Sequence, residues 1–354
     1  MPIRGIFIPL PVVQRSTGDS DRLKSGIARR DFLKLAGAAA LGLAFAPLPD
    51  VDVPAPGQAP LLGRTTWPLN LYDQPTFLAR RMGQLHFNDL FVIRKQATGV
   101  HFPHNPIWFR MDRGWVQSSS VQVVGYSLNK PILDVPAGGF LAEVTVPMTP
   151  TWYVPGERRG VPSNFYYSAV FWVVAAETDQ AGKTWYRLID DFQSSYFVAA
   201  EHLRRVPDES FSSLSTEVVD KRIEISLDKQ RLTAYENDKP VFVCKVASGL
   251  PGTETPRGQH RVLYKRPSRH MATGADVVGP EYNLPGVPWC SYFTEAGAAL
   301  HGTYWHNDYG RRNSAGCVNL SPANAKKLFR WTLPVAGPSE RYVSSETGTE
   351  LLIY

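Results

Sequence analysis

Two side chains near the C-terminal end of the chain are of the types needed for nucleophilic catalysis. Cys317 is the last of three cysteines, and His301 precedes it by sixteen positions. A free cysteine has a pKa of about 8.5, so little of it is thiolate at neutral pH unless a neighbouring imidazole takes the proton. Chain distance fixes no contact between the two, but a turn at Gly310 would let them meet. We therefore predict that Cys317 is a nucleophile and that His301 is its proton acceptor and donor.

The residues just before this cysteine suit acyl transfer. Ser314, Ala315 and Gly316 are small enough to let a substrate carbonyl approach the sulfur. Backbone N–H groups near Cys317 can hold the oxyanion of a tetrahedral intermediate. We assign this oxyanion or orienting role to Ser314 and Gly316.

Alternating strands and one helix must position these residues. Apolar and polar side chains alternate over 222–228 and 231–235, which predicts a hairpin. Further strands are predicted over 241–247 and 260–264, so the pattern is that of an antiparallel sheet. After the cysteine, Ser321 can cap a helix and Pro322 suits its first turn. The apolar face of this helix consists of Ala325, Leu328, Phe329 and Thr332.

Residues 217–354 resemble the catalytic domain of the YkuD-type L,D-transpeptidases. Four motifs carry the resemblance, in this order: Ser248-Gly249, Thr255-Pro-Arg-Gly258, His301-Gly-Thr303 and Ser314-Ala-Gly-Cys-Val-Asn319. The family fold is a mostly β sandwich, and its members cross-link or trim bacterial peptidoglycan. The resemblance implies that Cys317 is the nucleophile and His301 its base, with the main-chain carbonyl of Gly302 orienting the imidazole.

The resemblance also implies a two-step reaction on peptidoglycan stem peptides. Cys317 attacks the carbonyl before the terminal D-alanine of a tetrapeptide stem, and D-alanine leaves with a proton from His301. An amine of a neighbouring stem then resolves the thioester, whereas water in its place would make the protein a carboxypeptidase. No cofactor and no metal are expected.

Further residues are expected to contact substrate. Thr303 and Asn319 belong to the motifs above, and we assign both to substrate binding. Residues 267–286 are rich in Gly, Pro and polar groups, which favours a lid over the cleft. Tyr282 and Trp289, together with Phe293, either line that cleft or belong to the core.

One departure from the family pattern keeps other interpretations open. The family usually has histidine at the position of Ala315, so a degenerate, non-catalytic wall-binding protein is one alternative. Others are an inert buried Cys317, a cysteine peptidase of another specificity, or a zinc site that uses Cys317, His301 and His306. His306 could supply a second imidazole, although an exposed loop position is the favoured interpretation. A bridge between Cys244 and Cys290 is a further open possibility.

Residues 61–125 and 140–207 carry a weak internal repeat. Four short segments recur at offsets of 77 to 82 residues: 65–68 with 144–147, 91–93 with 172–174, 108–110 with 185–187, and 115–116 with 197–198. A nearly constant offset predicts two copies of one unit. Residues 114–122 and 196–204 resemble the closing strand and short helical turn of bacterial SH3-like barrels, a family that often binds cell-wall peptides. A spacer without a ligand is the alternative.

The first 46 residues are typical of an export signal. Arg29–Lys34 resembles a twin-arginine signal, and the apolar run 35–46 is too short, at about 1.5 Å per residue, to cross a hydrocarbon core of about 30 Å. A general secretory signal that happens to contain two arginines is the alternative. Residues 47–60 form a Pro-rich linker. We therefore expect export to the cell envelope, either cell wall or periplasm.

Composition and charge narrow the class of protein. With 43% hydrophobic and 20% charged residues the chain is not disordered, and its 29 prolines and 28 glycines favour short strands and turns. We predict a mainly β protein, with two small SH3-like barrels before a YkuD-type β sandwich that has one or two helices. Residues 1–46 hold +4 of the net charge of +6. No basic stripe remains for nucleic acid, and membrane contact is expected only during export.

Overall fold

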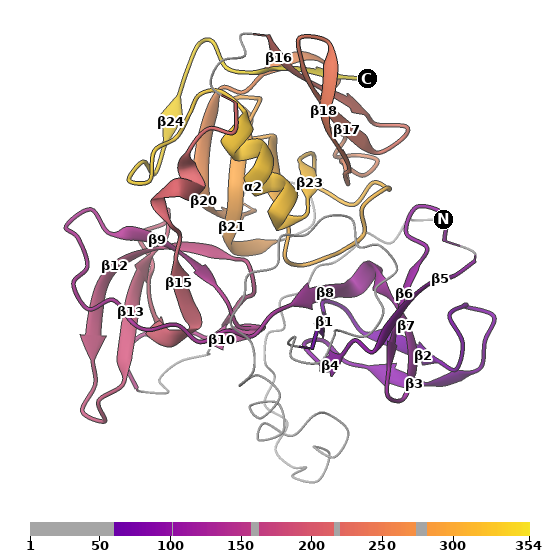
Figure 1. The fold of residues 1–354 in the computed structure, drawn as a ribbon, viewed down its shortest axis with the longest axis horizontal. Helices are drawn as coiled ribbons and strands as arrows, with labels where there is room; N and C mark the ends of the chain where they lie inside the picture. Colours follow the sequence, from indigo (N-terminus) through magenta and orange to yellow (C-terminus); the bar gives the residue numbers. More distant parts are fainter. Residues whose placement is uncertain (1–59, 101, 157–162, 216–219, 274–281) are drawn as a thin grey trace.

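The computed structural model describes residues 60–100, 102–156, 163–215, 220–273 and 282–354. These residues are mainly β, with a single α-helix, and form three sheet-based parts that follow one another along the chain (Figure 1). The predicted mainly β fold is therefore confirmed. The predicted export signal and nearly all of the predicted linker lie outside the described residues.

The first part is built around a short three-stranded sheet and a five-stranded sheet, in the orders β4-β1-β8 and β3-β2-β7-β6-β5. Its strands are β1 (Leu62–Thr65), β2 (Leu69–Tyr72), β3 (Arg81–Leu85), β4 (Leu90–Val92), β5 (Lys95–Thr98), β6 (Ile107–Met111), β7 (Gly114–Gln117) and β8 (Val121–Val124). A 3₁₀ turn, η1 (Ser118–Ser120), joins β7 to β8. Leu71, Phe109 and Val116 are among the buried side chains of its core.

The second part has a five-stranded sheet in the order β14-β13-β12-β9-β15, beside a pair of short strands. Its strands are β9 (Phe140–Val144), β10 (Met148–Pro150), β11 (Asn164–Tyr166), β12 (Val170–Thr178), β13 (Thr184–Ile189), β14 (Ser195–Ala199) and β15 (Leu203–Arg205). The 3₁₀ turn η2 (Ala200–His202) joins β14 to β15. A third 3₁₀ turn, η3 (Asp208–Phe211), leads out of this part.

The strands that carry the sequence repeat pair in the same way in both parts. β1 pairs antiparallel with β4 and β8, and β9 pairs antiparallel with β12 and β15. Likewise β6 pairs with β7, and β13 with β14, before a 3₁₀ turn in each case. The repeat thus corresponds to two copies of one strand arrangement. The likeness to SH3-like barrels and the predicted domain boundaries stay predictions.

The C-terminal part has two five-stranded sheets, in the orders β18-β17-β16-β25-β19 and β23-β22-β21-β20-β24. Their strands are β16 (Lys221–Ser226), β17 (Arg231–Glu236), β18 (Lys239–Lys245), β19 (Gly258–Arg261), β20 (Tyr264–Ala272), β21 (Asn283–Tyr292), β22 (Ala299–Gly302), β23 (Val318–Leu320), β24 (Val343–Ser344) and β25 (Glu350–Ile353). The predicted hairpin is confirmed as β16 and β17, which pair antiparallel.

The prediction of one strand over 260–264 is wrong. The N–H of Val262 donates to Thr349 O beside the first sheet, whereas the N–H of Leu263 donates to Tyr292 O in the second. The chain therefore changes sheets at this point, with the Val262 side chain fully buried in the core between them. Val262 and Leu263 are consecutive apolar residues, so the segment has no strict alternation that assigns it to one sheet, and its sequence does not reveal the crossing.

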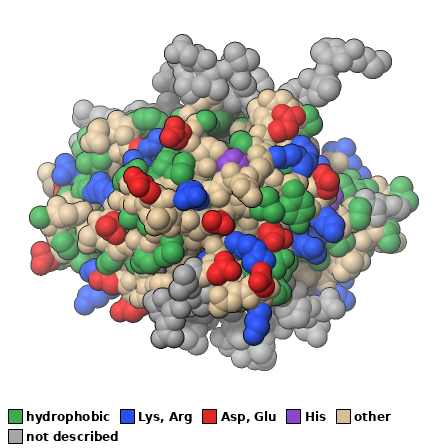
Figure 2. All heavy atoms as spheres, turned by 90° about the horizontal axis from the view of Figure 1, so that it is seen from above, with side chains coloured by type: hydrophobic (Ala, Val, Ile, Leu, Met, Phe, Trp, Pro, Cys, Tyr) green, Lys and Arg blue, Asp and Glu red, His purple; other side chains and the backbone are tan. Residues whose placement is uncertain are grey.

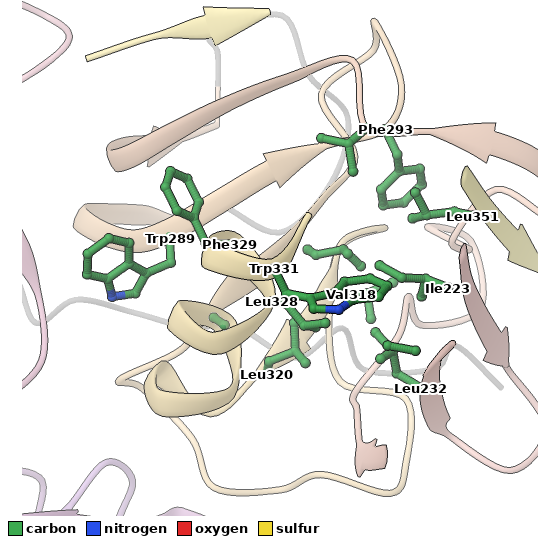
Figure 3. Close-up of a cluster of buried hydrophobic side chains, with 14 of the residues drawn as sticks. Ile223, Leu232, Trp289, Phe293, Val318, Leu320, Leu328, Phe329, Trp331 and Leu351 are labelled. Atoms are coloured by element: carbon green, nitrogen blue, oxygen red, sulfur yellow. The ribbon is translucent and has the colours of Figure 1, made fainter. Parts of the chain in front are cut away.

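The core of the C-terminal part lies between the two sheets and the helix α2 (Pro322–Trp331) (Figure 3). Ile223, Leu232 and Leu351 come from the first sheet, and Val318 and Leu320 from the second. Leu328, Phe329 and Trp331 come from the helix. Each such side chain stabilises the fold by about 1.5–3 kcal/mol through removal of apolar surface from water.

Helix α2 begins as its sequence predicts, and it ends at Trp331 with Thr332 as its C-cap. The Ser321 hydroxyl accepts a hydrogen bond from Asn324 N at 3.3 Å, and the Thr332 hydroxyl donates to Leu328 O at 2.9 Å. At the C-terminal end the buried ammonium of Lys265 donates to the carbonyls of Phe329, Thr332 and Pro334. A cation at this end of a helix is favourable because the last carbonyls carry partial negative charge.

Charged side chains of both signs are mixed on one face of the molecule. On the face shown in Figure 2, Lys and Arg side chains are interspersed with Asp and Glu side chains and form no basic stripe. Among the described residues, no helix is long and apolar enough to span a membrane.

Arg64 joins the three parts of the molecule. Its side chain is almost fully buried and donates to Gln122 Oε1 at 2.8 Å in the first part and to Tyr304 O at 2.8 Å in the C-terminal part. Its guanidinium also lies 4.1 Å from the centre of the Tyr166 ring in the second part. The partners are thus uncharged oxygen atoms and an aromatic face, which together compensate the buried cation.

We expect Arg64→Met to lower the free energy of unfolding by about 2–4 kcal/mol, because the apolar replacement leaves buried oxygen atoms without a donor. Urea denaturation followed by tryptophan fluorescence measures this change. The matched control is Arg81→Met, which removes an exposed guanidinium and should alter stability by less than about 0.5 kcal/mol. Equal effects of the two substitutions would contradict the role assigned to Arg64.

Candidate active site

Two adjacent strands carry the predicted base and nucleophile. His301 lies in β22, and Cys317 immediately precedes β23. The two strands pair in parallel, with Leu300 opposite Val318 and His301 opposite Asn319. His301 and Cys317 are sixteen positions apart in sequence, but the pairing of β22 with β23 brings their strands side by side.

Alternation along the two strands selects the face on which the site lies. Leu300, Val318 and Leu320 point into the core between the sheets. Successive side chains of a strand point to opposite faces, so His301 and Asn319 lie on the other face. Cys317 packs against the cluster on that same side, which contains Ala299 and Cys290. The structure thus brings the predicted nucleophile, base and Asn319 to one face of one sheet.

The imidazole of His301 is buried and held in one tautomer. It is 2% exposed, and its Nδ1 lies 3.1 Å from the main-chain oxygen of Gly302, the carbonyl expected to orient it. A proton on Nδ1 that donates to this carbonyl leaves the Nε2 lone pair to accept another. Burial lowers the pKa of His301 to about 4, so the ring is neutral at physiological pH.

The thiol of Cys317 is protonated in this arrangement. Its sulfur is partly buried and lies 3.9 Å from Gly297 O. Burial raises the pKa of Cys317 to about 11, and a backbone hydrogen bond from Ala299 opposes that shift in part. The pair at rest is therefore a thiol and a neutral imidazole and not an ion pair. Proton transfer to His301 must accompany the attack of the sulfur on its substrate.

The motifs that precede the site meet around the backbone of Cys317. Ser314 and Thr255 donate their hydroxyl hydrogens to Cys317 O. Gly249 N in turn donates to the Thr255 hydroxyl at 2.9 Å. Gly316 has a φ of 110°, a conformation that favours glycine, where the chain turns into β23. These contacts fix the direction in which the Cys317 side chain leaves the backbone.

One predicted oxyanion donor is already engaged in the described structure. Gly316 N lies 3.3 Å from the Ser314 hydroxyl oxygen and donates to it. Ser314 and Gly316 therefore support the nucleophile loop, and Gly316 N would have to release this bond to reach an oxyanion.

The predicted substrate contacts separate into two groups. Tyr282 packs against the same buried cluster as Cys317, and burial together with the nearby thiol raises the pKa of Tyr282. Trp289 instead belongs to the core, where its ring centre lies 5.3 Å from that of Phe329, and Phe293 is buried in the same cluster. Both side chains are buried, Trp289 against helix α2 and Phe293 near Leu351 (Figure 3), so the alternative of a core position applies to them.

Thr303 holds the start of the loop between the two strands. Its side chain is 2% exposed, and its hydroxyl lies 2.6 Å from the hydroxyl of Tyr309. Its N–H donates to Leu320 O at 2.9 Å. Thr303 therefore has a structural contact in this loop, and the substrate-binding role predicted for it stays a prediction.

Half of the predicted lid over 267–286 is regular sheet. Residues 267–272 belong to β20 and residues 283–286 to β21, and these strands pair antiparallel. The residues between Thr273 and Tyr282 lie outside the described residues. Periodicity missed these strands because Pro267 and Pro285 interrupt the alternation.

His306 is not the exposed loop histidine that its polar neighbours predicted. It is 8% exposed, and its Nε2 lies 2.9 Å from the side-chain amide nitrogen of Asn319. Nothing in the spacing of the loop 303–313 signals this burial, because the loop has neither helical nor strand periodicity.

The other cysteines form no bridge with each other. Cys244, Cys290 and Cys317 are all free. Cys244 lies in β18 of the first sheet of the C-terminal part and Cys290 in β21 of the second. Among the described residues, no group of three metal-ligating side chains is close enough to hold an ion, so the zinc alternative has no support.

Comparison with known proteins finds a likeness in the C-terminal part of the chain. Residues 220–350 match the family model of the YkuD L,D-transpeptidase catalytic domain. A Bacillus licheniformis protein that carries the name L,D-transpeptidase YkuD is 26% identical over 110 residues, which cover 30% of this chain and 57% of that protein. The chain therefore spans little more than half of the length of this curated relative.

The chain is also similar to solved structures of L,D-transpeptidases over about two fifths of its length. The catalytic domain of the Enterococcus faecium L,D-transpeptidase is 26% identical, with a TM-score of 0.31, over 39% of this chain and all of that domain. The Ldtfm-avibactam carbamoyl enzyme is 25% identical, with a TM-score of 0.31, over 39% of this chain and 49% of its own.

We expect the alkylation of Cys317 by iodoacetamide to be slow at neutral pH and to accelerate continuously above pH 9. The reason is that burial raises the pKa of Cys317 to about 11, so the thiolate fraction increases only towards that pH. Mass spectrometry of the peptide that contains Cys317 measures the rate. A plateau already reached below pH 7 would reveal a preformed ion pair and contradict the neutral pair.

We expect stability to fall as the pH decreases from 6.5 to 4. Burial lowers the pKa of His301 and of His306 from 6.5 to about 4, so in this window the unfolded chain binds protons that the folded protein does not. Each of the two imidazole rings adds up to about one proton to the number that the protein takes up on unfolding, which sets how steeply stability depends on pH. Urea titrations at several pH values measure it, and His306→Gln should show a dependence smaller by about one proton. An unchanged dependence in this variant would contradict the burial of a neutral His306.

Proposed function

We propose that this protein is an exported L,D-transpeptidase that acts on peptidoglycan stem peptides through a thioester on Cys317. The observation that carries the proposal is the parallel pairing of β22 with β23, which puts His301 and Cys317 on one face within a segment that matches the L,D-transpeptidase catalytic domain. The neutral imidazole, with Nδ1 bonded to Gly302 O, suits a base that works through Nε2.

The first half of the reaction forms the acyl-enzyme. The sulfur of Cys317 attacks the carbonyl carbon before the terminal D-alanine of a tetrapeptide stem while its proton passes to Nε2 of His301. The carbon–nitrogen bond then breaks, and the leaving amine of D-alanine takes that proton from Nε2. The products are free D-alanine and a thioester.

The second half transfers the acyl group. An amine of a neighbouring stem attacks the thioester carbonyl and gives a proton to Nε2 of His301, and the carbon–sulfur bond breaks. The sulfur recovers the proton from the imidazolium, so the enzyme returns to its neutral pair. Water in place of the amine gives carboxypeptidase action from the same intermediate, which makes it the alternative outcome.

The rest of the chain fits an enzyme of the cell envelope. The proposal includes export directed by residues 1–46 and wall contact by the two repeated parts over 61–125 and 140–207. Ala315 stands where the family usually has histidine, and it is exposed. We infer that His301 supplies the base function without a second histidine at that position.

Mass spectrometry of peptidoglycan fragments incubated with the purified protein tests the proposal. We expect new stem-to-stem products and released D-alanine. Cys317→Ala should reduce both by about 10³-fold or more, because it removes the nucleophile, whereas the matched control Cys244→Ala should retain them. Loss of D-alanine without cross-links would indicate a carboxypeptidase. Unchanged fragments with wild-type protein would refute the enzymatic proposal and favour a wall-binding protein.

A further inference from the structure

The loop that links the base to the nucleophile is docked on the first part of the chain. Asn307 N donates to Ser119 O at 2.8 Å, and Asn105 Nδ2 donates to Asn307 O at 3.0 Å. The side chain of Asp308, itself buried, lies 3.1 Å from His104 Nε2. These contacts hold the loop immediately after His306, and Arg64 holds it before His306 by donating to Tyr304 O at 2.8 Å. Residues outside the C-terminal part therefore help to set the position of the ring.

The ring of His306 has a defined tautomer. Its Nδ1 accepts a hydrogen bond from Asp308 N at 3.1 Å, so Nδ1 carries a lone pair. Burial lowers the pKa of His306 to about 4, and the nearby Asp308 carboxylate opposes that shift only in part. A neutral imidazole with a lone pair on Nδ1 carries its proton on Nε2. His306 therefore presents an N–H group to Asn319.

This N–H group determines the orientation of the Asn319 amide. With nitrogen towards the ring, Asn319 Nδ2 lies 2.9 Å from His306 Nε2 and 3.4 Å from Asn313 O. Two N–H donors would then face each other, and Asn319 Oδ1 would be buried without a hydrogen-bond partner among the described residues. The reverse orientation gives Nε2–H an acceptor and satisfies that oxygen.

The reverse orientation leaves the NH2 group of Asn319 as a buried donor beside the reacting groups. Asn319 is 2% exposed, is the register partner of His301, and lies two residues after Cys317 on the same face of the sheet. A fixed donor in such a place stabilises negative charge that develops on sulfur or on a carbonyl oxygen.

We propose that His306 is a positioning residue for the Cys317 site, which holds the Asn319 amide by its oxygen so that the NH2 group faces the reacting atoms. This inference rests on the proposed function for its role in turnover. Its effect on the sulfur can be measured without any substrate.

Two substitutions at His306 separate the two ring nitrogens. In His306→Gln the amide nitrogen can reach the place of Nε2 and donate to Asn319, whereas in His306→Asn the shorter side chain can replace only the acceptor at Nδ1. The control is His86→Gln, which changes an exposed histidine. The two readouts are the iodoacetamide alkylation rate of Cys317 at a fixed alkaline pH and the formation of stem-to-stem products.

We expect His306→Asn to slow alkylation of Cys317 about tenfold or more, and to slow product formation at least as much. His306→Gln should stay within about threefold of wild type, and His86→Gln should be unchanged. Asn319→Asp keeps an acceptor for His306 but removes the NH2 donor, so it should slow alkylation as His306→Asn does. If His306→Asn does not fold, the alkylation rate of Asn319→Asp tests the positioning role instead.

Failure of the inference and failure of the proposed function give different results. Equal alkylation rates in His306→Gln and His306→Asn, or an Asn319→Asp variant as reactive as wild type, would overturn the positioning role even if stem-to-stem products form. The expected order of alkylation rates without any peptidoglycan product would support the positioning role and refute the proposed function.

Discussion

The parallel pairing of β22 with β23 is the constraint on which the rest of the site depends. It sets His301 beside Asn319 and turns both away from the apolar core, while Leu300 and Val318 anchor the same strands in it. Because side chains alternate between the faces of a strand, a shift of one residue in this pairing would bury the base in the core and expose a leucine. The core and the site are therefore specified by one register.

Burial gives the site its electrostatic character. The same packing that fixes the imidazole of His301 keeps it neutral, and it keeps the thiol of Cys317 protonated. Desolvation penalises the charged form of each group, so both side chains are neutral before substrate binds. Reactivity must then come from proton transfer during attack and from fixed donors that meet the developing charge. The reacting groups and these donors must therefore be held in fixed positions. The paired strands β22 and β23 and the loop between them hold them.

The two repeated parts also contribute to the active centre. Arg64 binds the carbonyl of Tyr304, and Ser119 binds the N–H of Asn307, both in the loop between base and nucleophile. Tyr304 itself is buried in the core of the second part. The loop is thus held by side chains and main-chain groups from all three parts of the molecule. A change in the packing of the first two parts would reach the site through this loop.

The sequence by itself determined the mainly β class, the β16–β17 hairpin and helix α2, because local alternation, turn residues and the cap at Ser321 act over a few positions. It also singled out Cys317 and His301 through their chemistry. Only the tertiary structure decided that Trp289 belongs to the core, that the Thr303 hydroxyl meets that of Tyr309 and that His306 is buried against Asn319. These outcomes depend on contacts between segments far apart in the chain, which no local pattern records.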